Sequence, residues 1–210
     1  MSPEAGTRRI ALAVTGASGA LYAMRTLSAL LEHGQQVDLV ITEYGRRLLI
    51  DELGPEARVD RLQAYIENTW GEGVRRGDWQ LHSNKDLGAR IASGSRGADA
   101  MVIVPCSMKT MAAIAHGLSR SLVERAADVM LKEHRPLIIV PRETPMSLPQ
   151  LRNMVSCAEA GAIMVPAMPG FYQRPQTIGD LADFMAGRIL SLLRIEHELY
   201  PAWDPQAGRA

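Results

Sequence analysis

Residues 9–34 read RIALAVTGASGALYAMRTLSALLEHG, and this stretch decides the fold. The segment from Arg9 to Val14 is largely aliphatic, as in a strand buried on both faces. The turn TGASGA at 15–20 follows it, and residues 20–33 carry apolar side chains at helical spacing until Gly34 ends the helix. A strand, a glycine turn and a helix in this order indicate the first unit of a parallel α/β sheet.

The alternation of strands and helices continues along the chain. We expect strands at 36–42, 100–104, 137–140 and 162–165, and helices at 44–53, 61–68, 111–116, 121–133, 151–160 and 178–193. The stretch 70–90 is polar and is expected to be irregular. This pattern predicts an α/β fold of the Rossmann-like kind, with a doubly wound, mostly parallel sheet in three α/β/α layers.

Composition places the chain among ordinary globular domains. Of its 210 residues, 47% are hydrophobic and 22% are charged, which is enough apolar material for one substantial core. We predict a single domain over 1–210, with a flexible start at 1–8 and a tail at 196–210 that packs on a neighbouring subunit. Lys plus Arg and Asp plus Glu both number 23, so no overall basic field would gather nucleic acid or anionic lipid.

The amino-terminal sequence and the cysteines bear on location. No apolar run of about 18 residues occurs, and the start MSPEAGTRR lacks the apolar stretch of a secretory signal. We therefore predict a cytoplasmic protein without membrane contact. Cys106 and Cys157 make no metal-ligand spacing and are too few for a disulfide framework, so we predict two reduced thiols and no metal.

Candidate site residues are those that directly follow each strand, because ligands of open parallel sheets bind beyond the carboxyl ends of the strands. These positions hold Thr15 to Gly19, Thr42 and Glu43, Cys106 to Thr110, Arg142 and Glu143, and 169–172. Glycine and serine in a strand-to-helix turn let backbone N–H groups approach a phosphate, although a tight turn without a ligand favours the same residues. Two such turns on neighbouring strands predict a nucleotide-sized site.

Several charged residues have two interpretations. Arg142 and Glu143 would point to opposite sides of an extended strand, so only a turn lets both reach one ligand, and a surface ion pair is the alternative. Arg125 and Lys132 are seven apart and share one helix face, where they either bind an anion together or form a solvated surface.

Two further residues are suited to ligand binding, and two others are not assigned a role. Tyr172 lies in a loop rich in Pro and Gly, where a phenol can donate to a ligand oxygen, and Arg188 lies on the last helix. His116 and Cys106 invite catalytic interpretations. A helix-end histidine and a small thiol after a buried strand are more often structural.

Six motifs taken together resemble the UbiX-type flavin prenyltransferases. They are TGASGA at 15–20, ASGS at 92–95, PCSMKT at 105–110, ERAADVMLKEHRPL at 124–137, VPRETP at 140–145 and PGFYQRPQT at 169–177. The similarity spans about 9–203. It implies an enzyme that joins a dimethylallyl group from dimethylallyl phosphate to N5 and C6 of reduced FMN. It also implies a homo-oligomer, typically a dodecamer, and a UbiD-type decarboxylase that receives the product.

The resemblance also assigns roles to individual positions. It implies flavin contacts at Gly16, Ala17, Ser18, Thr42, Ser107, Met108, Lys109, Thr110, Arg125 and Arg142. It implies prenyl phosphate contacts at Lys132, Arg142, Glu143, Tyr172 and Arg188, and catalytic positions at Ser18, Glu52, Lys132, Arg142 and Glu143. Arg125 and Lys132 look like the pair that a neighbouring subunit contributes. Two positions depart from the family pattern: Thr42 stands where Ser is common, and Leu87 where some members have an aromatic residue.

Other functions remain open on the sequence. An FMN-dependent decarboxylase acting on a cysteine would share the fold, but such enzymes carry a PASANT-like turn where this chain has PCSMKT. A short-chain nicotinamide dehydrogenase is suggested by TGASG alone, yet no Tyr-x-x-x-Lys occurs to supply its acid/base pair. A flavin carrier without catalysis would use the same nucleotide-binding turns but would not require Lys132, Arg142 and Arg188 around a second phosphate.

Overall fold

A computed structural model describes residues 6–95 and 97–201 and contains one six-stranded sheet. The strands are β1 (Arg9–Val14), β2 (Gln36–Ile41), β3 (Asp78–His82), β4 (Ala100–Cys106), β5 (Leu137–Pro141) and β6 (Ile163–Met164). The α-helices are α1 (Ala20–Glu32), α2 (Glu43–Leu53), α3 (Leu62–Trp70), α4 (Met108–Ala115), α5 (Leu122–Lys132), α6 (Leu148–Glu159) and α7 (Ile178–Leu192). Short 3₁₀ helices occupy 55–57, 59–61, 72–76 and 90–92.

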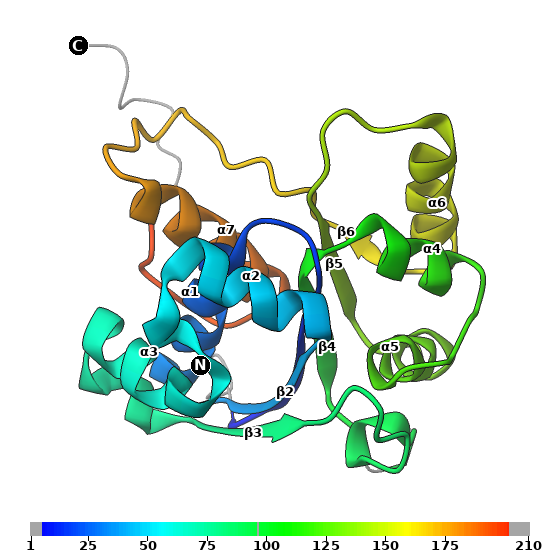
Figure 1. The fold of residues 1–210 in the computed structure, drawn as a ribbon, viewed down its shortest axis with the longest axis horizontal. Helices are drawn as coiled ribbons and strands as arrows, with labels where there is room; N and C mark the ends of the chain where they lie inside the picture. The colour runs from blue at the N-terminus through cyan, green and yellow to red at the C-terminus, as the bar shows by residue number, and fades with distance from the viewer. Residues whose placement is uncertain (1–5, 96, 202–210) are drawn as a thin grey trace, which may run out of the picture.

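The sheet is parallel throughout, in the order β3-β2-β1-β4-β5-β6, which is the doubly wound order. Helices α1, α2, α3 and α7 cover one face, and α4, α5 and α6 cover the other, which gives three layers (Figure 1). The predicted fold class is therefore confirmed. The strand order reverses between β1 and β4, so the turns after these two strands open at the point where such folds bind ligands.

Burial explains why the central strands could be predicted. Every residue of β4 and β5 is buried, and so is every residue of β1 and β2 except the first, because helices cover both faces. Along each strand, alternate residues belong to two separate cores, one under α1 and α7 and one under α5. In the described part of the chain, no helix is long and apolar enough to span a membrane.

The structure corrects the sequence-based prediction in two places. The stretch 70–90, predicted to be irregular, contains β3, which pairs only with β2. As an edge strand it alternates the polar residues Asp78, Gln80 and His82 with the apolar Trp79 and Leu81, so it lacked the continuous apolar run that identified the others. Helices α4 and α6 each begin three residues earlier than predicted, because Ser107 and Ser147 cap them.

Candidate functional site

Three helix N-termini meet at one cleft beyond the carboxyl ends of β1, β2 and β4. This first cleft has a volume of about 320 Å³ and is lined by Gly16, Thr42, Glu43, Tyr44, Asn84, Ser107, Lys109, Thr110, Ser121, Val123 and Glu124. Thr42, Ser107 and Ser121 cap α2, α4 and α5 respectively, each through its hydroxyl oxygen. Helix N-termini carry partial positive charge, and Lys109 adds a full one, so the cleft suits an anionic group.

Gly16 keeps the first cleft open on the side of α2. A Cβ atom at Gly16 would lie 2.6 Å from the Cβ of Tyr44, which is too close for any other residue without moving the start of α2. The close approach explains a glycine here without any need for a positive φ. Backbone of the turn is thereby exposed toward the cleft.

A second cleft, of about 540 Å³, lies on the other side of the same turn. Its lining is Ser18, Gly19, Leu21, Tyr22, Glu52, Leu53, Arg142, Ala167 and Ile178. Most of these side chains are apolar, while Ser18, Glu52 and Arg142 are polar. The turn after β1 therefore contributes to both clefts, and the second one suits an apolar group attached to a charged head.

Thr15 fixes the turn after β1 to the turn after β4. It is 1% exposed, and its Oγ1 donates to the Pro105 carbonyl at 2.8 Å and accepts from the Ser107 N–H at 2.7 Å. The backbone N–H of Thr15 donates to the same carbonyl at 3.2 Å. The sequence predicted Thr15 only as one of the residues that follow the first strand, because nothing local reveals a contact with residues so far along the chain.

We predict that Thr15→Val destabilises the protein by about 1–3 kcal/mol, because the valine leaves the buried Ser107 N–H without an acceptor at nearly unchanged volume. The free energy of unfolding in urea measures this. Thr26→Val is the matched control, since Thr26 is also buried and its hydroxyl donates only to the Tyr22 carbonyl within α1. Equal losses for the two variants would contradict the special role of Thr15.

Glu52 occupies the N-terminus of α1. Its carboxylate accepts from the Gly19 N–H at 2.9 Å and from the Ala20 N–H at 2.8 Å. An anionic ligand at this helix end would have to displace Glu52. A phosphate that binds the turn at 15–20 would therefore lie in the first cleft rather than at the N-terminus of α1.

Arg142 and Glu143 follow β5 in an irregular segment, and of the two only Arg142 lines a cleft. The Arg142 Nε donates to the Ser18 carbonyl at 2.9 Å, which holds the guanidinium against the turn after β1. The Glu143 carboxylate accepts from the Thr144 N–H at 2.9 Å rather than pairing with Arg142. A simple ion pair between these neighbours is thus not what the structure contains.

Comparisons with known proteins agree with this geometry. The flavoprotein family model matches residues 2–192. A flavin prenyltransferase UbiX from Halalkalibacterium halodurans is 45% identical over 193 residues, covering 92% of each chain.

The chain belongs to the UbiX family of flavin prenyltransferases.

Two solved structures of the UbiX type superpose closely on this chain. AnUbiX (PadA1), solved in complex with FMN and dimethylallyl pyrophosphate, is 37% identical with a TM-score of 0.84, covering 94% of this chain and 98% of that one. A dodecameric FMN-dependent UbiX-like decarboxylase from Escherichia coli O157:H7 is 36% identical with a TM-score of 0.82, covering 93% of this chain and 99% of that one.

Most positions that the UbiX resemblance singled out lie together in one subunit. Gly16, Thr42, Ser107, Lys109 and Thr110 line the first cleft, and Ser18, Glu52 and Arg142 line the second. Ala17 is buried within the turn between them, Met108 starts α4, and Glu143 follows Arg142.

Arg125, Lys132 and Arg188 line neither cleft of their own subunit. Arg125 donates to the Ala92 carbonyl at 3.3 Å and to Asp128 at 2.9 Å. Lys132 is the exposed last residue of α5, whose first turn lines the first cleft, so it lies about 15 Å away along the helix at about 1.5 Å per residue. Arg188 is exposed at a similar distance along α7 from Ile178.

Two loop residues of the UbiX resemblance lie close to the surface. Tyr172 is 58% exposed, in the loop whose two ends, Ala167 and Ile178, both line the second cleft. Leu87 is 49% exposed, in the loop after β3. Neither side chain lines a cleft within one subunit.

Several cleft residues escaped the sequence analysis. Leu21, Tyr22, Leu53 and Ile178 form the apolar wall of the second cleft, and burial raises the pKa of the Tyr22 phenol. Asn84 enters the first cleft and caps α5, since its side-chain oxygen accepts from the Val123 N–H at 3.2 Å. The Ser121-x-x-Glu124 pattern was the one signal for the start of α5 that could have pointed to this cleft.

Both cysteines are free and buried. Burial raises the pKa of Cys157 to about 11 and that of Cys106 well above its usual range. Because thiolate is the reactive form, we predict that iodoacetamide at pH 8 labels neither residue at an appreciable rate in the folded protein and labels both after unfolding in urea. Mass spectrometry of timed samples measures this, and rapid labelling of Cys106 in the folded protein would show an accessible thiolate.

Proposed function

We propose that this protein transfers a dimethylallyl group from dimethylallyl phosphate to N5 and C6 of reduced FMN, forming prenylated FMN. One observation supports this above others: the turn after β1 is shared by an anion-binding cleft and an apolar cleft with Arg142 at its mouth. A flavin transferase needs two such neighbouring sites, one for the nucleotide and one for the allylic donor.

The first cleft fits FMN by the chemistry of its lining. Capped N-termini of α2, α4 and α5 and the Lys109 ammonium suit the phosphate. Gly16 leaves room for a ring system to lie close to the backbone of the turn. When bound, reduced FMN supplies the N5 and C6 atoms that are alkylated.

This chain's own residues supply charge, proton transfer and exclusion of water. Arg142, fixed on the Ser18 carbonyl, stabilises the negative charge that develops on the departing phosphate. Glu52 and Ser18 line the same cleft, so the Glu52 carboxylate would accept the proton released during the second bond formation, with the Ser18 hydroxyl as a relay. Leu21 and Tyr22, both half-buried, would keep water away from the allylic carbon.

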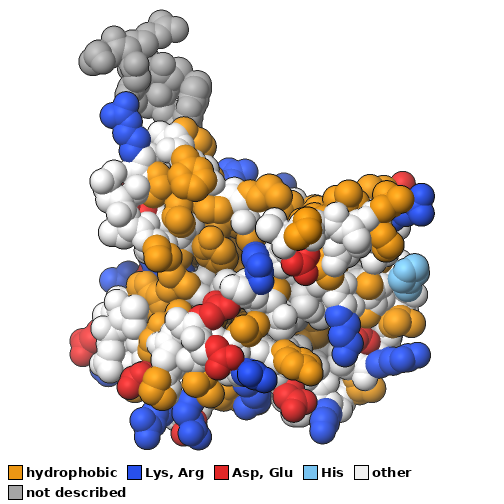
Figure 2. Space-filling view, turned by 45° about the horizontal axis from the view of Figure 1, so that its top comes forward, with side chains coloured by type: hydrophobic (Ala, Val, Ile, Leu, Met, Phe, Trp, Pro, Cys, Tyr) orange, Lys and Arg blue, Asp and Glu red, His pale blue; other side chains and the backbone are white. Residues whose placement is uncertain are grey.

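Assembly of several copies would complete this site. Hydrophobic side chains gather on one surface over α6 and over the loop before α7 (Figure 2), and the exposed ones include Leu148, Leu151, Val155, Met168, Phe171 and Ile178. Apolar surface of this extent favours contact with further copies, which would bring Lys132 of one subunit toward the clefts of another. We propose a homododecamer in the cytoplasm that passes its product to a UbiD-type decarboxylase.

The test is an anaerobic incubation of the purified protein with reduced FMN and dimethylallyl phosphate, followed by mass spectrometry of the released flavin. The expected result is a mass gain of one prenyl unit. Dimethylallyl diphosphate and geranyl phosphate in parallel samples report which donors are accepted. Protein that binds FMN and leaves it unchanged with all three donors would favour the carrier or the cysteine decarboxylase interpretation.

A further inference from the structure

The loop that carries Tyr172 rests on an aromatic stack. The Tyr172 ring meets the Phe184 ring edge to face, with centroids 5.9 Å apart at 83°. Gly170 lies against both rings, because an added Cβ there would lie 2.6 Å from the Tyr172 Cε1 and 3.1 Å from the Phe184 Cζ. These contacts fix the position of the Tyr172 ring although 58% of the residue is exposed.

The stack continues into residues 195–201, which we name the C-terminal clasp. Phe184 lies 5.1 Å from Tyr200, and Tyr200 lies 5.2 Å from His197, measured between ring centroids. Both clasp rings cover Gly187 of α7, since an added Cβ there would lie 2.7 Å from the His197 Cε1 and 2.8 Å from the Tyr200 Cδ1. The Gln173 side chain donates to the Pro201 carbonyl at 2.8 Å, which ties the clasp to the loop directly.

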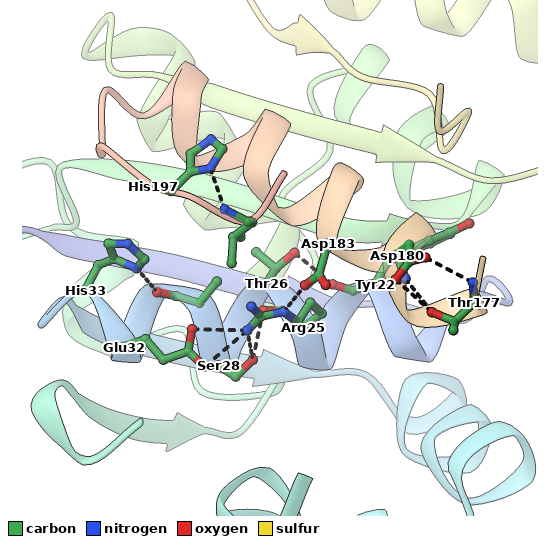
Figure 3. Close-up of polar contacts among 12 residues, drawn as sticks. Tyr22, Arg25, Thr26, Ser28, Glu32, His33, Thr177, Asp180, Asp183 and His197 are labelled. Atoms are coloured by element: carbon green, nitrogen blue, oxygen red, sulfur yellow. Dashed lines mark hydrogen bonds and ion pairs between the residues drawn. The ribbon is translucent and has the colours of Figure 1, made fainter. Parts of the chain in front are cut away.

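Helix α7, which carries Phe184, is joined to α1 by polar side-chain contacts (Figure 3). Asp183, next to Phe184, pairs with the buried Arg25 of α1, which also contacts Glu32 at 3.2 Å. At the start of α7, Thr177 and Asp180 form a capping box that ends the loop. These contacts fix the part of α7 that carries Phe184, and the loop of Tyr172 packs between this helix and the clasp.

Hydrogen bonds define the state of His197. Its Nδ1 accepts from the Leu199 N–H at 3.3 Å, so this nitrogen carries no proton, and Nε2 lies 2.9 Å from the Ser191 Oγ. Burial is the largest cause that lowers the pKa of His197, and His33 of α1 and Arg188 of α7 lower it further. The ring is thus neutral at pH 7 and packs on Tyr200 as an uncharged group.

We propose that Tyr200 and His197 are positioning residues for the prenyl donor. The C-terminal clasp would hold the loop that carries Tyr172, whose two ends, Ala167 and Ile178, line the second cleft. This inference rests on the proposed function for the donor itself and on the UbiX resemblance for the role of Tyr172. The clasp residues touch neither cleft, so their effect must pass through the loop between Ala167 and Ile178. Loss of the clasp leaves the flavin cleft intact and weakens recognition of the donor phosphate.

The test compares Tyr200→Ala with Tyr200→Phe in the full-length protein. We expect Tyr200→Ala to raise the KM for dimethylallyl phosphate about fivefold, in line with one aromatic contact, with little change in kcat or in FMN affinity. Tyr200→Phe keeps the ring and should restore the KM. Tyr65→Ala is the control, because it also removes a tyrosine ring that packs on a neighbouring aromatic ring, Trp70 at 6.0 Å, and Tyr65 lines neither cleft.

A double-mutant cycle decides whether Tyr200 acts through Tyr172. In a Tyr172→Phe background, Tyr200→Ala should raise the KM no further, and an equal fivefold effect in both backgrounds would overturn the proposal. Hydrogen exchange of the Arg174 amide, which donates to the Phe171 carbonyl at 2.9 Å, reports the loop without any donor. Faster exchange of this amide in Tyr200→Ala would support a role of the clasp in holding the loop, whether or not the proposed function is correct. Unchanged exchange would contradict that role.

Discussion

In the Lys132→Ala variant, prenylation of reduced FMN is expected to fall by about two to three orders of magnitude, while the affinity for FMN stays unchanged. Under the proposed function, Lys132 of a neighbouring copy would stabilise the negative charge on the departing phosphate. Turnover measured by mass spectrometry and flavin binding measured by fluorescence give the two quantities. Arg58→Ala is the control, because Arg58 is an exposed cation paired with Asp60 far from either cleft.

The position of Lys132 makes this prediction informative about assembly. Within one subunit the side chain is exposed at the far end of α5, about 15 Å along the helix from the cleft. No rotamer of a lysine covers that distance, so an effect on chemistry requires the lysine of a neighbouring copy. Light scattering would show whether the Lys132→Ala variant keeps its oligomeric state. A loss of activity in an intact oligomer would therefore identify a site shared between subunits.

Mixed oligomers test the shared site directly. Lys132→Ala and Arg142→Ala subunits are each expected to be inactive alone, yet co-refolded at equal amounts they should regain about a quarter of the wild-type activity by random pairing. Regain occurs because one subunit supplies an intact Arg142 and its neighbour an intact Lys132. If the mixture stays inactive while its subunits are shown to exchange, both residues act within one chain and the structural placement of Lys132 needs revision.

The fold could be predicted because its signals are local. A parallel sheet could be predicted from the run at 9–34 and from the sequences of β4 and β5. These two strands are fully buried, and burial on both faces requires continuous apolar residues. Strand β3 gave no such signal, because an edge strand is stabilised by pairing with β2 and tolerates Asp78 and Gln80 at exposed positions.

The site was predictable only where position after a strand sufficed. That rule placed Gly16, Thr42 and Ser107 at one cleft, as the structure has them. It could not find the Thr15 contact with Pro105, the Glu52 contact with α1 or the role of Tyr22, because each depends on segments that only the folded chain brings together. Long-range contacts between side chains and backbone leave no periodic trace in a sequence.

The second large effect is expected for Glu52→Gln, which should lower kcat for prenylation about a hundredfold with a small change in FMN affinity. Glutamine keeps a carbonyl oxygen that can accept from the Gly19 or Ala20 N–H, so the turn after β1 is retained. It cannot take up a proton at the pH of the reaction. Steady-state rates at saturating donor, together with the solvent deuterium isotope effect, measure the loss.

Comparison with Asp51→Asn separates proton transfer from simple loss of charge. Asp51 precedes Glu52 on α2, is exposed and pairs with Arg47 at 3.2 Å, so the same change in charge there should leave kcat unaltered. Removing the Glu52 charge from the N-terminus of α1 costs about 0.3–1 kcal/mol of stability by itself, which is too little to explain a hundredfold loss of rate. If Glu52→Gln turned over at the wild-type rate, the carboxylate would serve only to cap α1, and the proton released from the flavin would have to leave through Ser18 or solvent.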